Sequence, residues 1–211
     1  MKYIINNEEY EVVIEKKNNK NTYIRVKEDL KIYVTTNYFV SKSYIKSLLD
    51  NNIDYLENML NKRKQQLERN ECFYYLGNKY DIILVSSFDS LEVLGNKIYA
   101  KDNKMVEKWY KKQMESLFKE RLILNYNKFE EDIPFPNLRI RNMKTRWGVC
   151  NKKSQTITLN SNLMKYDITK LDYVIIHELS HFIYFDHSSN FWNLVAKYCK
   201  NYKKVRKELR D

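Results

Sequence analysis

The sequence predicts a fold of the α+β class, in which the N-terminal half is rich in strands. Long helices follow the first group of strands. Apolar and polar side chains alternate over residues 10–15, 23–27 and 30–34, as they do in half-buried strands. Apolar residues then recur at helical spacing over residues 45–67 and again over residues 103–130. Separate stretches of strand and helix periodicity, without an internal repeat, are typical of an α+β domain.

Turn and capping residues mark the ends of these elements. Ser41 or Ser43 can cap the first helix, and the pair Gly77-Asn78 supplies a turn between two strands. Two prolines after residue 130 end the second long helix, because proline cannot continue a helical hydrogen-bond pattern. Further strands are predicted at residues 74–76, 80–85, 97–99, 138–144 and 155–160.

The composition predicts one globular domain over residues 1–211. Only three Gly and two Pro are present, so a flexible linker is not expected between an N-terminal lobe (1–100) and a second lobe (101–211). No window approaches the roughly 18 to 20 apolar residues of a membrane span, and no signal peptide is visible. The three cysteines form no CxxC pair, which suits a reducing compartment. We therefore expect a cytoplasmic protein that does not enter a membrane.

All three histidines of the chain fall in one short stretch of the second lobe, from His177 to His187. The first two form an HExxH pattern around Glu178, and His187 follows His181 by six positions. Residues four apart on a helix lie about 40° apart around its axis, so both imidazoles can reach one metal ion. Zinc favours nitrogen ligands, and a catalytic zinc takes three protein ligands and leaves one position for water. The pattern predicts a zinc site, with a carboxylate beside it.

The chain must turn before His187, because a continuing helix would carry that residue about 240° around the axis from His181. No glycine follows Gly148 to make this turn. We therefore expect Asp186 or a neighbour to adopt left-handed backbone geometry, which Asp tolerates better than Tyr or Phe. A final helix is expected to begin after Ser188 or Ser189 and to run to about residue 209.

Thr169, followed by Asp172 three residues later, predicts the start of the helix that carries the first two histidines. Asp172 and Asp186 could each orient a histidine by accepting a hydrogen bond from its ring. The sequence does not choose between them.

One set of motifs in this lobe resembles a known family. The segment Lys144-Thr145-Arg146-Trp147-Gly148-Val149-Cys150, the HELSH run, His187-Ser188 and Phe191-Trp192 resemble the YgjP-like metallopeptidases, relatives of the SprT-like proteases. The close resemblance covers roughly residues 135–210, with Val149 where the family pattern has Ser. It implies a zincin-like core of HExxH helix, β-hairpin and C-terminal helix, with three histidines on zinc and the motif glutamate as base.

Residues and resemblance together predict a zinc-dependent hydrolase, foremost a metallopeptidase acting on a peptide or protein. Glu178 would accept a proton from the water on zinc and pass it to the leaving group. Arg146 and Lys144 could stabilise the oxyanion or hold an anionic group of the substrate, and Tyr184 could donate a hydrogen bond to a tetrahedral intermediate. A purely structural role is the alternative for each of these three residues.

The net charge of +11 leaves two other hypotheses open. One is a nucleic-acid-associated, SprT-like protein that acts on DNA-bound proteins, since a basic chain attracts polyanions. The other is a zinc enzyme that hydrolyses a nucleotide or another phosphorylated small molecule. Scattered lysines are also typical of an ordinary solvated surface, so the positive charge need not indicate a ligand. The basic cluster over residues 197–210, which includes Arg206, is interpreted as such a helix face and as the most favourable place for an anion.

Overall fold

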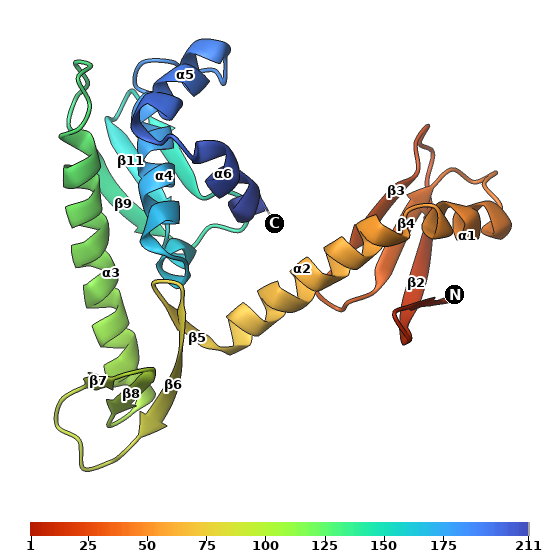
Figure 1. The fold of residues 1–211 in the computed structure, drawn as a ribbon, viewed down its shortest axis with the longest axis horizontal. Helices are drawn as coiled ribbons and strands as arrows, with labels where there is room; N and C mark the ends of the chain where they lie inside the picture. Colours follow the sequence, from red (N-terminus) through yellow and green to blue (C-terminus); the bar gives the residue numbers. More distant parts are fainter. Residues whose placement is uncertain (211) are drawn as a thin grey trace. The chain divides into compact units, whose positions relative to one another are not determined.

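The computed structural model describes residues 1–210 and divides the chain into two compact units, Met1–Glu71 and Cys72–Asp211. Both units combine helices and sheets, which confirms the predicted α+β class (Figure 1). The division lies at Glu71, so residues 72–100, expected in the N-terminal lobe, belong to the unit that carries the histidines. No helix in the described part of the chain is long and apolar enough to span a membrane.

The N-terminal unit packs two helices against a four-stranded sheet of order β1-β2-β4-β3. Strands β2 and β4 are parallel, and the other two pairs are antiparallel. Ile32 and Val34 of β4 are fully buried against Ile45 and Leu49. The elements are β1 (Lys2–Ile5), β2 (Glu8–Lys16), β3 (Tyr23–Val26), β4 (Ile32–Thr36), α1 (Lys42–Asp50) and α2 (Ile53–Glu71).

Helix α1 begins as predicted, because the side chain of Ser41 accepts a hydrogen bond from the backbone N–H of Tyr44 at 3.2 Å. The expectation of one continuous helix over residues 45–67 is wrong. Helix α1 ends at Asp50, and the Asn52 side chain donates to the carbonyl oxygen of Leu48 at 2.8 Å. Asparagine side chains compete with the backbone for hydrogen bonds, which breaks the helix without disturbing its apolar spacing.

The C-terminal unit holds two sheets and the helices that carry the histidines. One sheet has the order β5-β6-β8-β7, and the other has the order β10-β11-β9. In the second sheet β10 and β11 form an antiparallel hairpin, while β9 lies parallel to β11. The elements are β5 (Phe73–Tyr75), β6 (Asn78–Leu84), β7 (Glu92–Leu94), β8 (Lys97–Ala100), α3 (Asn103–Tyr126), β9 (Asn137–Arg141), β10 (Gly148–Asn151), β11 (Thr156–Asn160), η1 (Ser161–Lys165), α4 (Ile168–Ser180), α5 (Ser189–Tyr198) and α6 (Tyr202–Arg210).

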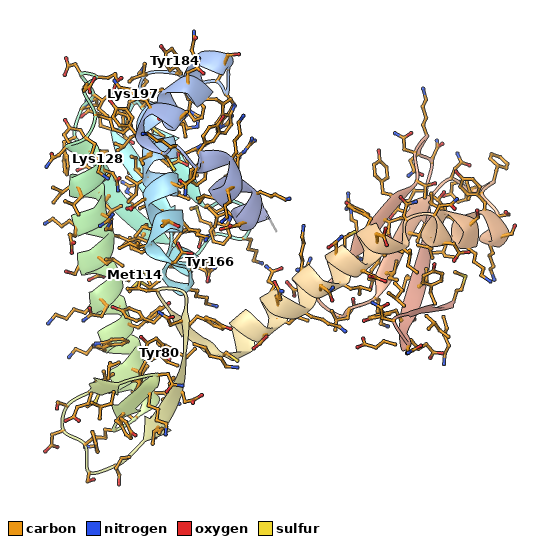
Figure 2. The ribbon with its side chains drawn as sticks, viewed as in Figure 1. Tyr80, Met114, Lys128, Tyr166, Tyr184 and Lys197 are labelled. Atoms are coloured by element: carbon orange, nitrogen blue, oxygen red, sulfur yellow. The ribbon has the colours of Figure 1, made fainter. Side chains whose placement is uncertain are left out.

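Helix α4 is the centre of this unit, and α3 runs beside it (Figure 1). Its apolar side chains are buried on several faces at once, against α3, the hairpin and the two C-terminal helices. Figure 2 shows Tyr166 and Tyr184 at opposite ends of α4, before and after the helix. A helix buried on all sides is held rigidly, which suits it to present side chains at fixed positions.

The structure corrects three boundaries in this unit. Strand β9 ends at Arg141 rather than at residue 144, so the Lys-Thr-Arg-Trp segment is a loop. The predicted last helix is two helices, separated at Cys199, whose backbone leaves the helical region with φ −136° and ψ 84°. The short strands β1 and β7 and the 3₁₀ turn η1 were not anticipated.

Candidate metal centre and active-site cleft

The N-cap residue of helix α4 is Asp167 rather than Thr169. The Asp167 side chain accepts a hydrogen bond from the backbone N–H of Thr169 at 3.1 Å and pairs with Lys170. The predicted N-cap, Thr169, is therefore wrong by two residues. Asp167, which precedes it in the same polar stretch, takes that position. Lys170 also pairs with Glu208 of α6 at 2.6 Å, which ties the start of α4 to the C-terminal helix.

Asp172 does not orient a histidine. Its carboxylate accepts hydrogen bonds from Nε of Arg121 and Nδ2 of Asn125 on α3, each at 2.8 Å. Both side chains of the ion pair are 19% exposed, and Asn125 is buried. This cluster joins α3 to α4 about one turn of helix before the histidines, and its role is structural.

The last turn of α4 brings the three histidines together. The imidazole centroids of His177 and His181 lie 4.9 Å apart, as expected for positions four apart on one helix. His187 returns to the same place, with its Nε2 atom 3.1 Å from Nε2 of His177. Within the described residues, one potential ligand atom from each histidine lies within 4.8 Å of the other two. The structure thus assembles the three predicted ligands in one place.

The turn that returns His187 uses ordinary backbone geometry. Helix α4 ends at Ser180, whose carbonyl oxygen accepts the N–H groups of Ile183 at 3.1 Å and Tyr184 at 3.0 Å. No residue of this turn has a positive φ, so the expectation of a left-handed Asp186 is wrong. The chain unwinds gradually through a tightened last turn and an extended Ser188, so no residue has to reverse it alone.

Aromatic side chains of α5 pack against the imidazole rings. Phe191 is fully buried and stacks on His181 with centroids 4.6 Å apart. Trp192 stacks on His187 at 5.5 Å. His187 itself is exposed, and its ring also lies 4.9 Å from the Phe191 ring and close to His177, so several aromatic contacts position it. Phe191 and Trp192 belong to the motifs that resemble the family, but the sequence did not predict that they stack on the histidines.

The ring nitrogens of the histidines leave lone pairs available for a metal. Nδ1–H of His181 donates to the carbonyl oxygen of Tyr184 at 3.1 Å, which leaves its Nε2 with a free lone pair. Nε2 of His177 faces Nε2 of His187, while its Nδ1 is buried without a hydrogen-bond partner. Burial lowers the pKa of all three imidazoles, and that of His177 falls to about 3. The rings are therefore neutral at ordinary pH, as metal ligands must be.

These nitrogens fit a zinc ion. Two nitrogens held 2.0–2.1 Å from a tetrahedral zinc lie about 3.4 Å apart, close to the 3.1 Å between Nε2 of His177 and Nε2 of His187. Three neutral imidazoles and no thiolate form a donor set that suits zinc. A direct hydrogen bond between the two rings would satisfy one nitrogen of each, and it would not account for the convergence of the third ring.

Glu178 lies beside the histidines and is largely buried. Its side chain is only 5% exposed, and this burial raises its pKa to about 8, against the opposing effects of the Cys150 backbone N–H and the charge of Arg146. Gly148 of β10 packs directly against it. A carboxylate in such a place holds a proton more readily than one in water.

A cleft of about 540 Å³ opens over these residues. Its walls combine the histidines and Glu178 with the edge strand β10, the aromatic Phe185, and two arginines, Arg146 and Arg206. Lys144 and Tyr184, the other predicted substrate-binding residues, do not line the cleft. Tyr184 contributes its carbonyl oxygen to His181 instead.

Arg146 is placed by a buried asparagine of the neighbouring strand. Asn160 is 3% exposed and its Nδ2 donates to the carbonyl oxygens of Met143 at 2.7 Å and Arg146 at 2.8 Å. These bonds hold the loop between β9 and β10 in place. Asn160 was not singled out from the sequence, where it is only the last residue of a predicted strand.

Arg206 belongs to the basic cluster that the sequence predicts to be a solvated helix face and the most favourable place for an anion, and the structure places it in the lining of the cleft. It follows Val205 and precedes Leu209, both of which are buried, so it stands at the edge of the apolar stripe of α6. That position beside the stripe is the signal in the sequence that could have identified it.

Comparison with known proteins agrees with the resemblance. The model of the "YgjP-like, metallopeptidase domain" family matches residues 20–211. Among solved structures, the metallopeptidase zymogens abylysin of Pyrococcus abyssi and jannalysin of Methanocaldococcus jannaschii are 25% and 26% identical to this chain, with TM-scores of 0.36 and 0.33. Each likeness covers 46% of this chain, and 90% and 96% of those chains respectively. No curated protein matches the chain. Since the family model spans most of its length, the chain belongs to the YgjP-like metallopeptidase-domain family.

Proposed function

We propose that the protein is a zinc-dependent peptidase with a zincin-like core, in which His177, His181 and His187 hold the metal. The observation that carries this proposal is the convergence of three neutral imidazoles beside a buried carboxylate, at the bottom of a cleft. A zinc ion held there would polarise the peptide carbonyl and lower the pKa of water toward neutrality.

Glu178 is the proposed general base. Its place next to His177, facing the cleft, lets a carboxylate take a proton from metal-bound water and then give it to the leaving amine. Its contacts with Gly148 and the Cys150 backbone N–H fix the carboxylate in one orientation. Proton transfer from a positioned carboxylate contributes about 10²–10⁴-fold to the rate of comparable reactions.

Arg146 is the group we propose for the oxyanion that develops on the substrate. It lines the cleft and acts on Glu178 electrostatically, and its backbone is held by Asn160. A preorganised cation stabilises developing negative charge more effectively than mobile water does. Lys144 and Tyr184, which lie outside the lining of the cleft, are weaker candidates for the same role.

A peptide or protein is the substrate class that the family supports. The nucleic-acid hypothesis rested on net charge and on kinship with SprT-like proteases, and the family match adds no support to it. Hydrolysis of a phosphorylated small molecule would use the same metal chemistry, and it is therefore an outcome that the test must be able to reveal.

The test is a side-by-side screen of the zinc-loaded protein against a mixed peptide library and a panel of nucleotides. We expect cleavage of peptides alone, and we expect the Glu178→Gln variant to retain its metal but lose about 10²-fold or more in rate. A metal-dependent activity toward nucleotides alone would reject the peptidase. Cleavage that survives in Glu178→Gln would reject this residue as the base.

A further inference from the structure

Arg206 on α6 extends into the same cleft as the histidines and Glu178. The carbon of its guanidinium lies 4.3 Å from the ring centroid of Trp192, the residue that stacks on His187. Stacking on an aromatic face leaves the N–H groups at the edge of a guanidinium free to donate hydrogen bonds. Arg206 is therefore held close to the candidate metal centre with its donors available.

The helix that carries Arg206 is tied down at several points. Val205 is 2% exposed and Leu209 is 7% exposed. The Trp147 Nε1–H donates to the carbonyl oxygen of Leu209 at 2.8 Å, and Glu208 pairs with Lys170 at the start of α4. These contacts fix the backbone on both sides of Arg206. The guanidinium is consequently placed by rigid elements rather than by a mobile surface helix.

Arg206 has no acidic partner among the residues that the structure describes. The only acid on its own helix, Glu208, pairs with Lys170 and approaches Lys204. The cleft itself contains two guanidinium groups, Arg206 and Arg146, and Glu178 as its one carboxylate in the described lining.

A half-buried guanidinium with no partner, in a cleft with excess positive charge, is suited to an anionic ligand. Its planar set of five donors matches the two oxygens of a carboxylate, and such charge-assisted pairs are stronger than neutral hydrogen bonds. In a peptide, a carboxylate is present at a free C-terminus and on the side chains of Asp and Glu.

We propose that Arg206 is a specificity residue that binds a carboxylate of the peptide substrate, and that the enzyme therefore selects peptides with an acidic side chain or a free C-terminus near the scissile bond. This inference rests on the proposed peptidase function for its substrate class. It gives Arg206 no part in the bond-breaking step.

The test is a binding measurement that needs no turnover. It uses the full-length Glu178→Gln protein with zinc and four alanine-based hexapeptides, N-acetylated to remove the terminal amine. The reference peptide has a C-terminal amide and no charge. The second peptide has a free C-terminal carboxylate, the third has a central Glu, and the fourth has a central Gln as a neutral match for the third.

We expect at least one acidic peptide to bind about 10- to 100-fold more tightly than its neutral match. The two acidic peptides distinguish the C-terminal carboxylate from the acidic side chain. Adding Arg206→Met to the Glu178→Gln protein should abolish the preference. Adding Lys207→Met, a neighbouring change on the exposed face of α6, should leave it intact.

Arg206→Lys serves as a second variant because it keeps the charge and most of the stem but lacks the planar fork. Its preference should fall severalfold without vanishing, and this result holds even if Arg206→Met fails to fold. Equal binding of acidic and neutral peptides would overturn the proposal. An acidic preference that persists in Arg206→Met, or that is undiminished in Arg206→Lys, would also overturn it, since the carboxylate would then bind the metal or Arg146.

The outcomes for the two proposals can be separated. An acidic preference that depends on Arg206, in a protein that cleaves no peptide, would reject the peptidase and leave the carboxylate site standing. Peptide cleavage without any acidic preference would support the peptidase and reject the role of Arg206.

Discussion

Gly148 and Glu178 are in such close contact that any Cβ atom at position 148 would collide with the Glu178 side chain. A Cβ atom added to Gly148 would lie 2.5 Å from Oε1 of Glu178 and 2.7 Å from its Cγ. Contacts this short force one group to move, and Glu178 is only 5% exposed. The edge strand β10 therefore sets the position of the proposed base, from a segment about thirty residues earlier in the sequence.

The variant Gly148→Ala should displace this carboxylate. We expect a loss of about 10-fold or more in peptidase rate, because small displacements of catalytic groups reduce rate sharply. Overpacking of this kind should also lower the free energy of unfolding by about 1–3 kcal/mol. The zinc content should stay unchanged, since no ligand is touched. Activity assays, thermal unfolding and metal analysis measure the three effects.

The double variant Gly148→Ala, Glu178→Ala is the control for a direct clash. Removing the Glu178 side chain removes the atoms that the new Cβ meets, so the second change should cost less stability in the Gly148→Ala background than in the wild type. Additive losses would mean that Gly148 matters for another reason, such as the backbone of β10.

The pair Arg121 and Asp172 should affect stability without affecting metal binding. Replacing Asp172 with Leu leaves the guanidinium half-buried and unpaired, and we expect a loss of about 1–3 kcal/mol. The double variant with Arg121→Met should recover part of this loss, because no unpaired charge then remains. Unchanged zinc content in both variants is expected. Loss of zinc in Asp172→Leu would restore the original hypothesis that this residue orients a ligand.

Local sequence patterns predicted most of the regular elements and the closeness of His177 and His181, because both depend on spacing along one helix or strand. His177 and His181 are an example, since four residues of helix determine their separation. The turn before His187 was predicted to need a left-handed residue, and a gradual unwinding after Ser180 replaced it. Such a turn depends on several backbone hydrogen bonds that no single residue type indicates.

Contacts between distant segments could not be predicted from the sequence. Glu178 of α4 packs against Gly148 of strand β10, and Asp172 pairs with Arg121 of α3. Arg206 was read as part of a basic surface because its neighbours are lysines, although buried residues on either side place it in the cleft. Side chains at the edge of an apolar stripe are ambiguous until the packing of the helix is known.

Metal retention should depend on pH in a defined direction. Protons compete with zinc for imidazole, whose ordinary pKa is about 6.5. Burial lowers the pKa of all three histidines, so each stays neutral to lower pH and competition begins later on acidification. We expect zinc to be retained at pH 6.5 and lost steeply between about pH 6 and 5. Zinc release followed with a chromogenic chelator measures this, and half-release above pH 6.5 would contradict the expectation.

Removal of zinc should loosen the turn over residues 184–190 more than α4. His187 is exposed and its ring is held by a few ring contacts with Trp192, Phe191 and His177, whereas α4 has buried apolar contacts on several faces. The metal would thus be the strongest link between the turn and the helix. Hydrogen exchange on the metal-free and zinc-loaded protein should show faster exchange confined to the turn. Equal protection in both forms would mean that aromatic packing alone preforms the site.

Metal analysis of protein purified without chelators measures whether these three histidines hold one zinc ion. We expect about one zinc per chain in the wild type and in Glu178→Gln. In His177→Ala we expect less than a tenth of that, with the fold intact by circular dichroism. Zinc below a tenth of an equivalent in the wild type, or a full equivalent retained in His177→Ala, would contradict this expectation.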